Sequence, residues 1–359
     1  MNSPFSNLEG TKTAFSRPFE QVKMKPFEKF GIDGGLVWRL EAAQEEARPI
    51  WERIEAVKSR NFFKVLNAFR EARVDETCLS GTTGYGYGDL GRKTLEEVYA
   101  RVFGAESALV RIQISSGTQA ISLCLFSLLS PGDEVVLVTG RPYDTLCHVM
   151  GLPLPRADVH TPGEEVQPGS LAELGVAFRE IPLSREGEPD LKAIAKGVTS
   201  RTKLVFIQRS KGYAWRPSLT VARIGEIVEV VRGANREAIV LVDNCYGEFV
   251  EAEEPTEVGA DIVVGSLIKN PGGTIAPTGG YVAGKRELVQ KVAGRLTAPG
   301  TGRDIGPSLG FNRLLFQGLF LAPILVSESL KGLVVAARLF ETLGLAVMPR
   351  YDGERGDMV

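Results

Sequence analysis

Two polar residues at the ends of apolar runs are the first candidates for chemistry in this sequence. Lys269 ends the apolar run 260–268 and opens onto the turn Asn270-Pro-Gly-Gly, and Asp243 ends the apolar run 238–242. If both runs are adjacent strands of a parallel sheet, both side chains emerge where α/β sheets bind ligands. A lysine can form an imine with the aldehyde of pyridoxal 5'-phosphate, and a carboxylate can pair with its pyridine nitrogen. The pair therefore predicts a pyridoxal phosphate site.

Each of the two residues alone also has an ordinary structural explanation. A lysine at a strand end can lie along apolar surface with its ammonium in water, and Asp243 can cap a helix or a turn. A lysine with the usual pKa of about 10.4 must also lose its proton before it attacks a carbonyl. The prediction therefore depends on the groups that accompany Lys269 and Asp243.

A phosphate-binding turn is the next such group. The short strand expected at 108–113 is followed by the start of a helix, with Ser116 as its cap. The backbone N–H groups of Gly117 and Thr118 would face an anion at the positive end of the helix dipole, and glycine lets a phosphate come close. A plain helix start has the same residues. Ser266, three residues before the lysine, could complete the phosphate site.

An aromatic ring follows another expected strand. Tyr143 lies just beyond the apolar run 134–138, so its ring would reach the same edge of the sheet and could stack on the pyridine. A loop tyrosine often only packs against its neighbours. Four strand ends that each supply a group suited to one cofactor favour a common site.

The motifs around these residues resemble a known enzyme family. In order and spacing they are similar to the Cys/Met-metabolism branch of fold-type-I pyridoxal phosphate enzymes, and within it to the methionine gamma-lyase-like group often labelled aluminium resistance proteins. The resemblance covers the chain from about residue 35 onward. It is carried by Thr83-Gly-Tyr-Gly-Tyr-Gly-Asp-Leu-Gly-Arg, Ser115-Ser-Gly-Thr-Gln, Val242-Asp-Asn, Gly265-Ser-Leu-Ile-Lys-Asn and Ala276-Pro-Thr-Gly-Gly-Tyr-Val-Ala-Gly.

This resemblance implies a role for each matching residue. Lys269 would be the imine lysine and proton shuttle, Asp243 the pyridine partner and Tyr143 the stacking ring. The phosphate ligands would be Ser116, Gly117, Thr118 and Ser266. The branch usually has another hydroxyl directly before the lysine, where this chain has Ile268.

The resemblance also implies a homo-oligomer, a dimer or a tetramer, with sites shared between subunits. In this branch a tyrosine and an arginine enter the phosphate site from a neighbouring subunit, and the candidates here are Tyr85, Tyr87 and Arg92. A flexible surface turn is the alternative for this loop. Residues 86–91 also fit G-x-G-x-x-G, but the segment before them, 73–78, is polar rather than a hydrophobic strand, so we reject a dinucleotide site.

The substrate carboxylate has no motif-based anchor in this chain. Related chains continue for some tens of residues, and in the branch that region supplies the arginine for the carboxylate. Because this sequence ends at Val359, the C-terminal domain looks incomplete. Arg209, at the end of the expected strand 203–208, is the remaining candidate for substrate binding.

Composition excludes several other classes of protein. The formal charge of −2, from 42 Lys and Arg against 44 Asp and Glu, gives no basic field for nucleic acid. We find no stretch that looks long and apolar enough for a membrane and no signal peptide, and therefore expect a cytoplasmic enzyme. His148 and His160 have no ligand-type partners, so we expect no metal. The four cysteines predict no disulfide framework, and Cys245 either packs in the core or faces the cofactor.

Alternating strand and helix patterns predict an α/β fold. We expect a seven-stranded, mainly parallel sheet with both faces covered, and the last strand antiparallel at or near the edge. By resemblance this is the three-layer aspartate-aminotransferase-like fold. We expect an N-terminal arm and helix (1–60), a large cofactor domain (61–300) and the start of a small C-terminal domain (301–359). Helices are expected at 37–58, 62–72, 94–103, 118–129, 191–196, 221–231, 309–321 and 324–343.

The leading functional hypothesis is a carbon–sulfur lyase that performs α,γ-elimination on methionine or a related sulfur amino acid, with Lys269 as the base and Tyr143 as the acid. It depends on family resemblance. The same cofactor also supports β-elimination, γ-replacement and transamination. A cofactor-binding protein with little catalysis is a further alternative, since the carboxylate anchor is missing.

Overall fold

The computed structural model describes residues 30–153 and 168–359. The predicted N-terminal arm, up to residue 29, and His160 lie outside these ranges. The chain divides into two compact units, residues 1–46 and 47–359, and the larger unit contains the whole sheet. The predicted domain boundaries at 60 and 300 stay predictions.

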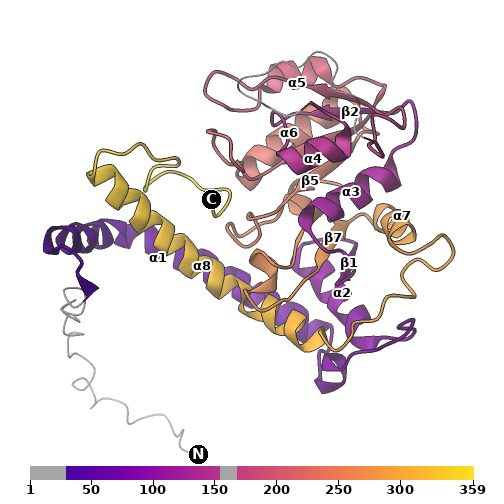
Figure 1. Ribbon diagram of the computed structural model, residues 1–359, viewed down its shortest axis with the longest axis horizontal. Coiled ribbons are helices and arrows are strands. Elements are labelled where there is room, and N and C mark those ends of the chain that lie inside the picture. Colours follow the sequence, from indigo (N-terminus) through magenta and orange to yellow (C-terminus); the bar gives the residue numbers. More distant parts are fainter. Residues whose placement is uncertain (1–29, 154–167) are drawn as a thin grey trace, which may run out of the picture. The chain divides into compact units, whose positions relative to one another are not determined.

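One seven-stranded sheet organises the larger unit (Figure 1), as the sequence predicts. Three of its strands are buried along their whole length and a fourth along all but its first residue, which explains their continuous apolar runs. The strands are β1 (Ser107–Arg111), β2 (Glu134–Leu137), β3 (Ala177–Glu180), β4 (Thr202–Gln208), β5 (Ile239–Asp243), β6 (Ile262–Ser266) and β7 (Gly280–Gly284).

The strand order is β1-β7-β6-β5-β4-β2-β3. All neighbouring pairs are parallel except those of β7, which runs antiparallel to both β1 and β6. The antiparallel direction of β7 was expected, and the structure places this strand one position in from the edge. Its first residue, Gly280, has no room for a side chain, because a Cβ there would lie 2.5 Å from Cγ2 of Ile114.

Helices cover both faces of the sheet, so the fold has the three layers expected. Side chains alternate between two cores; in β5, Val240 and Val242 join one and Leu241 the other. The first core also takes side chains from α2 (Leu90–Val102), α5 (Leu191–Gly197) and α6 (Val221–Ala234). The second takes them from α3 (Gly117–Leu128), α4 (Asp144–Met150) and α7 (Arg286–Leu296). Short 3-10 helices lie at η2 (Glu76–Leu79), η3 (Pro255–Val258) and η4 (Asn270–Gly272).

Two pairs of predicted helices are each one continuous helix, which corrects the prediction. Helix α1 runs over Gly34–Glu71, and α8 over Asn312–Thr342 with Pro323 inside it. Asn61 lies in the gap between the two helices expected here, and its side chain donates to backbone carbonyls of the loop after β5. In the larger unit, α1 packs on α8 through edge-to-face rings, Phe62 against Phe320 and Phe69 against Phe316.

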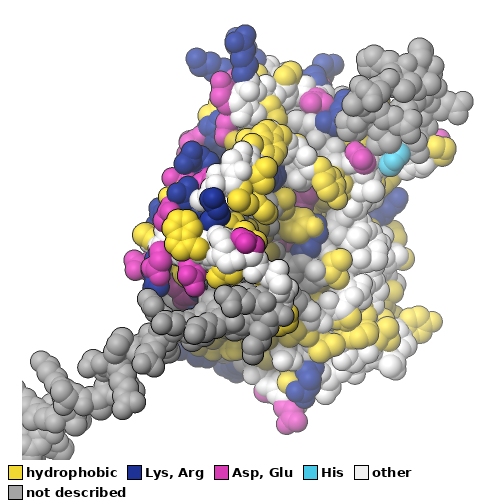
Figure 2. Space-filling model, turned by 60° about the vertical axis from the view of Figure 1, so that its left-hand side comes forward, with side chains coloured by type: hydrophobic (Ala, Val, Ile, Leu, Met, Phe, Trp, Pro, Cys, Tyr) yellow, Lys and Arg dark blue, Asp and Glu magenta, His cyan; other side chains and the backbone are white. Residues whose placement is uncertain are grey.

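Helix α8 also corrects the expectation that no segment is long and apolar enough for a membrane. By length and composition its 31 residues could cross one, with a mean hydropathy of 1.8 in its most apolar window. Such values are weak evidence, because 44% of that window is buried inside the protein and a core helix passes the same test. On the face in Figure 2, charged side chains are interspersed with hydrophobic ones.

Candidate active site

Asp243 and Lys269 meet at the carboxyl edge of the sheet. Asp243 is the last residue of β5, and Lys269 follows the adjacent parallel strand β6 by three residues. The Asp243 carboxyl is buried, and burial raises its pKa, although the attraction of Lys269 opposes the rise. The structure therefore brings together the two residues that the sequence paired.

Lys269 lies half-buried among acidic and aromatic groups. Its Nζ is 4.0 Å from the centre of the Tyr246 ring. Burial lowers the pKa of Lys269, but nearby Cys245 and Asp243, followed by Tyr246 and Glu248, outweigh burial and raise it overall. These neighbours therefore favour the protonated amine.

The first turn of α3 approaches this pair from the other side. Ser116 is the N-cap, as predicted, and its Oγ accepts from the N–H of Gln119 at 3.1 Å. A Cβ on Gly117 would lie 2.8 Å from Sγ of Cys245 and 3.6 Å from Cβ of Ser266. The helix start is therefore in direct contact with the ends of β5 and β6.

Ser266 has the signature of a ligand-binding side chain. It is 1% exposed, and its Oγ has no hydrogen-bond partner among the described residues. Buried hydroxyls nearly always have a partner. The unpaired Oγ therefore fits a phosphate oxygen next to Gly117.

Tyr143 and Thr118 complete the group of predicted residues that lie together. The hydroxyl of Tyr143 is 3.1 Å from Oγ1 of Thr118. Burial and, to a lesser extent, Asp243 raise the pKa of Tyr143 well above its usual value. Tyr143 therefore keeps its proton at neutral pH.

The loop that contains Tyr85, Tyr87 and Arg92 has an exposed part and a buried part. Tyr85 and Tyr87 are 74% and 64% exposed, with ring centres 5.8 Å apart, so their rings are available to another molecule. Arg92 is buried, and its guanidinium donates to carbonyls of its own chain, at Gly86 and in the segment 303–306. Arg92 is therefore not available to a neighbouring subunit, which corrects its predicted role.

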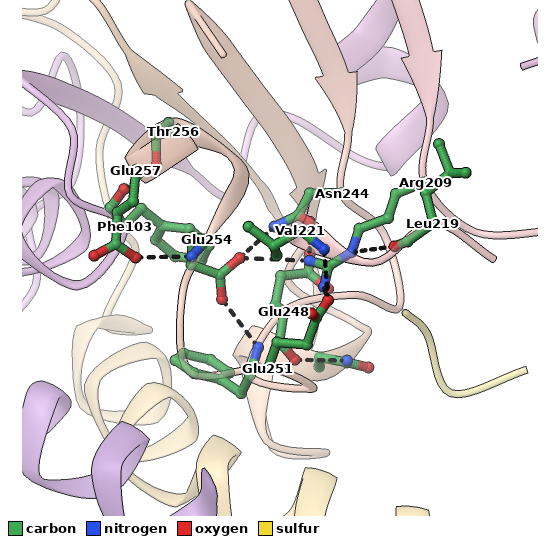
Figure 3. A network of polar contacts seen from close by, with 12 residues as sticks. Phe103, Arg209, Leu219, Val221, Asn244, Glu248, Glu251, Glu254, Thr256 and Glu257 are labelled. Carbon is green, nitrogen blue, oxygen red and sulfur yellow. Dashed lines mark hydrogen bonds and ion pairs between the residues drawn. The ribbon is translucent and has the colours of Figure 1, made fainter. Parts of the chain in front are cut away.

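Arg209 is not the substrate anchor that the sequence suggested, because it is 0% exposed and committed to its own chain (Figure 3). Its guanidinium donates to Oδ1 of Asn244 and to Oε2 of Glu251, both at 2.7 Å, and lies 3.7 Å from the buried Glu254 carboxylate. It also donates to the Leu219 carbonyl. This network fixes the loop that follows Asp243.

Sequence reasoning missed two residues beside Lys269, Tyr246 and Glu248. Both lie in the loop 244–250, directly after β5. The density of polar residues after a buried strand, Asp-Asn-Cys-Tyr-Gly-Glu, was the available signal. For Cys245 the two alternatives coincide, because the thiol is buried and also contacts the site beside Gly117.

No group of three or more possible metal ligands occurs within residues 30–153 and 168–359.

Comparisons with known proteins give a matching family, similar sequences and similar structures. The model of a family described as methionine gamma-lyase matches residues 37–359. The chain is 47% identical over 310 residues to the uncharacterized protein YnbB of Bacillus subtilis (strain 168), covering 86% of this chain and 71% of YnbB. It is 28% identical over 219 residues to L-methionine gamma-lyase of Pseudomonas putida, and the match covers 60% of this chain and 47% of that enzyme. A crystal structure of a carbon–sulfur lyase involved in aluminium resistance from Clostridium novyi NT superposes with a TM-score of 0.86 at 42% identity, covering 92% of this chain and 77% of that one.

Proposed function

Because this chain belongs to the methionine gamma-lyase family of pyridoxal phosphate-dependent enzymes, we propose that it is a carbon–sulfur lyase that eliminates the γ-substituent of methionine or a related sulfur amino acid. The family, the fold type and the cofactor expected from the motifs are confirmed by the family match and the similar structure. The observation that carries the proposal is the meeting of Lys269 and Asp243 at adjacent strand ends.

The described residues fit three polar groups of the cofactor: the aldehyde, the pyridine nitrogen and the phosphate. Lys269 would hold the aldehyde carbon and Asp243 the pyridine nitrogen, with Tyr143 against the ring. The phosphate would take the unpaired hydroxyl of Ser266. It would also take the N-terminal turn of α3, with Ser116, Gly117 and Thr118.

The cofactor, when bound, accepts the electron pair released at the substrate Cα. Lys269, freed by the substrate amine, takes the proton from Cα and then moves a proton from Cβ. Tyr143, whose hydroxyl lies 3.1 Å from Oγ1 of Thr118, would donate its proton to the departing thiolate. Hydrolysis then releases a thiol, a 2-oxo acid and ammonia.

Residues near Asp243 hold its carboxyl group in one orientation. An ionised Asp243 would keep the pyridine nitrogen of the cofactor protonated, and the attraction of Lys269 opposes the rise in the pKa of Asp243 that burial causes. Cys245 donates its backbone N–H to Oδ1 of Asp243 at 3.1 Å, which orients the carboxylate. Removing this acid would therefore weaken both cofactor binding and the acceptance of charge.

We further propose a cytoplasmic homo-oligomer, a homotetramer by resemblance, in which the exposed Tyr85 and Tyr87 reach a neighbouring subunit's phosphate site. Their exposure supports this assignment. Size-exclusion chromatography with light scattering would measure the oligomer. A monomer that still binds the cofactor fully would contradict the shared site.

A second candidate is β-elimination on the same cofactor. It is favoured by a similar crystal structure from Listeria monocytogenes, 45% identical to this chain with a TM-score of 0.84, which is described as that of a candidate cystathionine beta-lyase involved in aluminium resistance. Incubation with methionine, cystathionine and cysteine, followed by identification of the 2-oxo acid, separates the reactions. 2-Oxobutyrate from methionine supports γ-elimination, and pyruvate from cysteine without reaction of methionine supports β-elimination.

The cofactor assignment is tested by borohydride reduction of the purified protein. We expect visible absorbance that is lost on reduction and a cofactor adduct that peptide mapping places on Lys269. Lys269→Ala should abolish the adduct, whereas Lys285→Ala, at an exposed lysine after β7, should leave it unchanged. An adduct on any other lysine would refute the assignment.

A further inference from the structure

The loop 244–250 presents an aromatic ring to Lys269 that the proposed reaction leaves unused. The ring of Tyr246 lies under the ammonium, 4.0 Å from Nζ to the ring centre. Tyr246 has a backbone φ of +69°, in the left-handed region that residues with a side chain rarely adopt. Its carbonyl accepts from the N–H of Met358 at 3.1 Å, and Gly247 donates to Asn244 within the turn. The backbone is thus held in the conformation that brings the ring to the lysine.

The same loop carries a buried acid, Glu248. It is 0% exposed, and its Oε1 accepts from the hydroxyl of Tyr281 at 2.9 Å. Its Oε2 is buried without a hydrogen-bond partner among the described residues. The Oε2 atom of this carboxyl group can therefore still accept a hydrogen bond, close to the end of β6.

Two contacts join Glu248 to the lysine segment. Asn270, the residue after Lys269, donates from Nδ2 to the Glu248 carbonyl at 2.9 Å. Gly265, four residues before the lysine, leaves space for the acid, because a Cβ there would lie 2.4 Å from Oε1 of Glu248. These contacts fix Glu248 against the backbone of the segment that carries Lys269.

From this geometry we propose that Tyr246, joined by Glu248 where that acid is ionised, forms an ammonium site that holds Lys269 in place after it has left the cofactor and taken up a proton. The inference rests on the proposed function, in which a substrate amine releases Lys269. The ring attracts the cation through its π electrons, and Glu248 adds an attraction through charge above about pH 8, where its carboxyl group is ionised. Both are positioning residues, since they act on the reaction through Lys269.

Other charged and titratable groups around this site also affect the protonation of Lys269 and Glu248. Burial raises the pKa of Glu248 to about 8, and Lys269 lowers it. Above that pH Glu248 is ionised and favours the ammonium form of Lys269, as Asp243 does from β5. The groups that interact with one or both residues are Asp243, Cys245 and Glu254 on this side of the sheet, Tyr281 on β7 and Tyr99 on α2.

The test is the pKa of Lys269 in the full-length cofactor-free protein, measured by pH-dependent competitive acetylation with acetic anhydride and mass spectrometry. The variants are Tyr246→Leu, which removes the ring, Tyr246→Phe, which keeps it, and Glu248→Gln, which removes only the charge. Glu253→Gln is the matched control, because Glu253 is an exposed acid just beyond the same loop. Far-ultraviolet circular dichroism checks that each variant is folded.

We expect Tyr246→Leu to lower the pKa of Lys269 by about 0.5 pH units, the size of an exposed cation–π contact. Glu248→Gln should lower it by about 0.5 to 1 pH units. Tyr246→Phe and Glu253→Gln should stay within about 0.2 units of the parent protein. If Tyr246→Leu and Glu248→Gln also stay within that margin, the ammonium site is refuted. Should Glu248→Gln fail to fold, the half-exposed Tyr246 variants decide alone.

Failure of the proposed function has a different result. In that case borohydride traps no adduct on Lys269 of the parent protein, whatever the pKa values of the variants. An adduct on Lys269 together with unchanged pKa values in the variants rejects only the ammonium site.

Discussion

Gly117 offers the sharpest test of how the site is assembled. In the structure a Cβ at this position would lie 2.8 Å from Sγ of Cys245, whereas ordinary contacts of a Cβ begin at 3.4 Å. Gly117→Ala therefore requires the methyl group and the sulfur to separate by 0.6 Å. Both residues are buried, so neither can move into solvent.

The size of the effect follows from the cost of overpacking. An extra methyl group in a well-packed interior costs about 1 to 3 kcal/mol, and we expect Gly117→Ala to lower the free energy of unfolding by that amount. Replacing Cys245 by Ala removes the sulfur that the methyl group meets. In the Cys245→Ala background, Gly117→Ala should therefore cost about 1 to 2 kcal/mol less than in the parent protein.

The assay is urea unfolding of the cofactor-free protein, followed by circular dichroism, for both single variants and the double variant. Gly233→Ala is the control, because Gly233 is an exposed glycine in α6 and an added Cβ would meet no atom within 4 Å. It should stabilise the protein by about 0.4 to 1 kcal/mol. If the effects of Gly117→Ala and Cys245→Ala add within about 0.5 kcal/mol, the contact between α3 and the end of β5 is not as described.

Three further predictions concern the buried polar groups. Arg209→Met leaves the buried Glu254 without its cation and should lower the free energy of unfolding by about 3 to 5 kcal/mol in urea; a loss below about 1 kcal/mol would show that the network is not a stabilising one. Glu248 binds its proton up to about pH 8 in the folded protein but only to about pH 4.3 when unfolded. Stability should therefore fall as pH rises through this window, and a thermal melt of Glu248→Gln should show a flatter fall. Ser266→Ala removes a hydroxyl that has no partner among the described residues, so it should leave the cofactor-free protein about as stable while weakening cofactor binding roughly tenfold; equal losses in both would argue for a structural hydroxyl.

Much of the site was predictable because its residues directly follow buried strands. Lys269 and Asp243 each end an apolar run, and parallel strands carry such residues to one edge. The Ser116 cap was predictable from local chemistry, because a serine before a helical pattern satisfies free backbone N–H groups. These inferences need only contacts that are close in sequence or imposed by strand direction.

The residues that were misjudged depend on partners far away in sequence. Arg209 directly follows β4, but its guanidinium is taken by Glu251, more than forty positions away. Arg92 is bound by carbonyls more than two hundred residues later. No local pattern in the sequence shows that these charges are already paired.

The same limit explains the long helices. Helix α8 continues through Pro323, although proline lacks the N–H that continues a helix. The packing of Phe316 and Phe320 against α1 covers the turns around that position, so the helix continues through it. Tertiary packing decided the outcome, which local propensity cannot reveal.

The antiparallel strand β7 separates the two strands from which α3 and the segment with Lys269 continue. Since β7 runs against both neighbours, β1 and β6 point the same way, but two strand spacings, roughly 10 Å, separate them. The chain leaving β1 must therefore step across the start of β7 before α3 can reach Ser266. Gly280 leaves room for this crossing, because Ile114 occupies the volume that a side chain at position 280 would fill. A bulkier residue at position 280 would hold the crossing chain away and so displace the helix start from the lysine strand, without touching any group that carries out the chemistry.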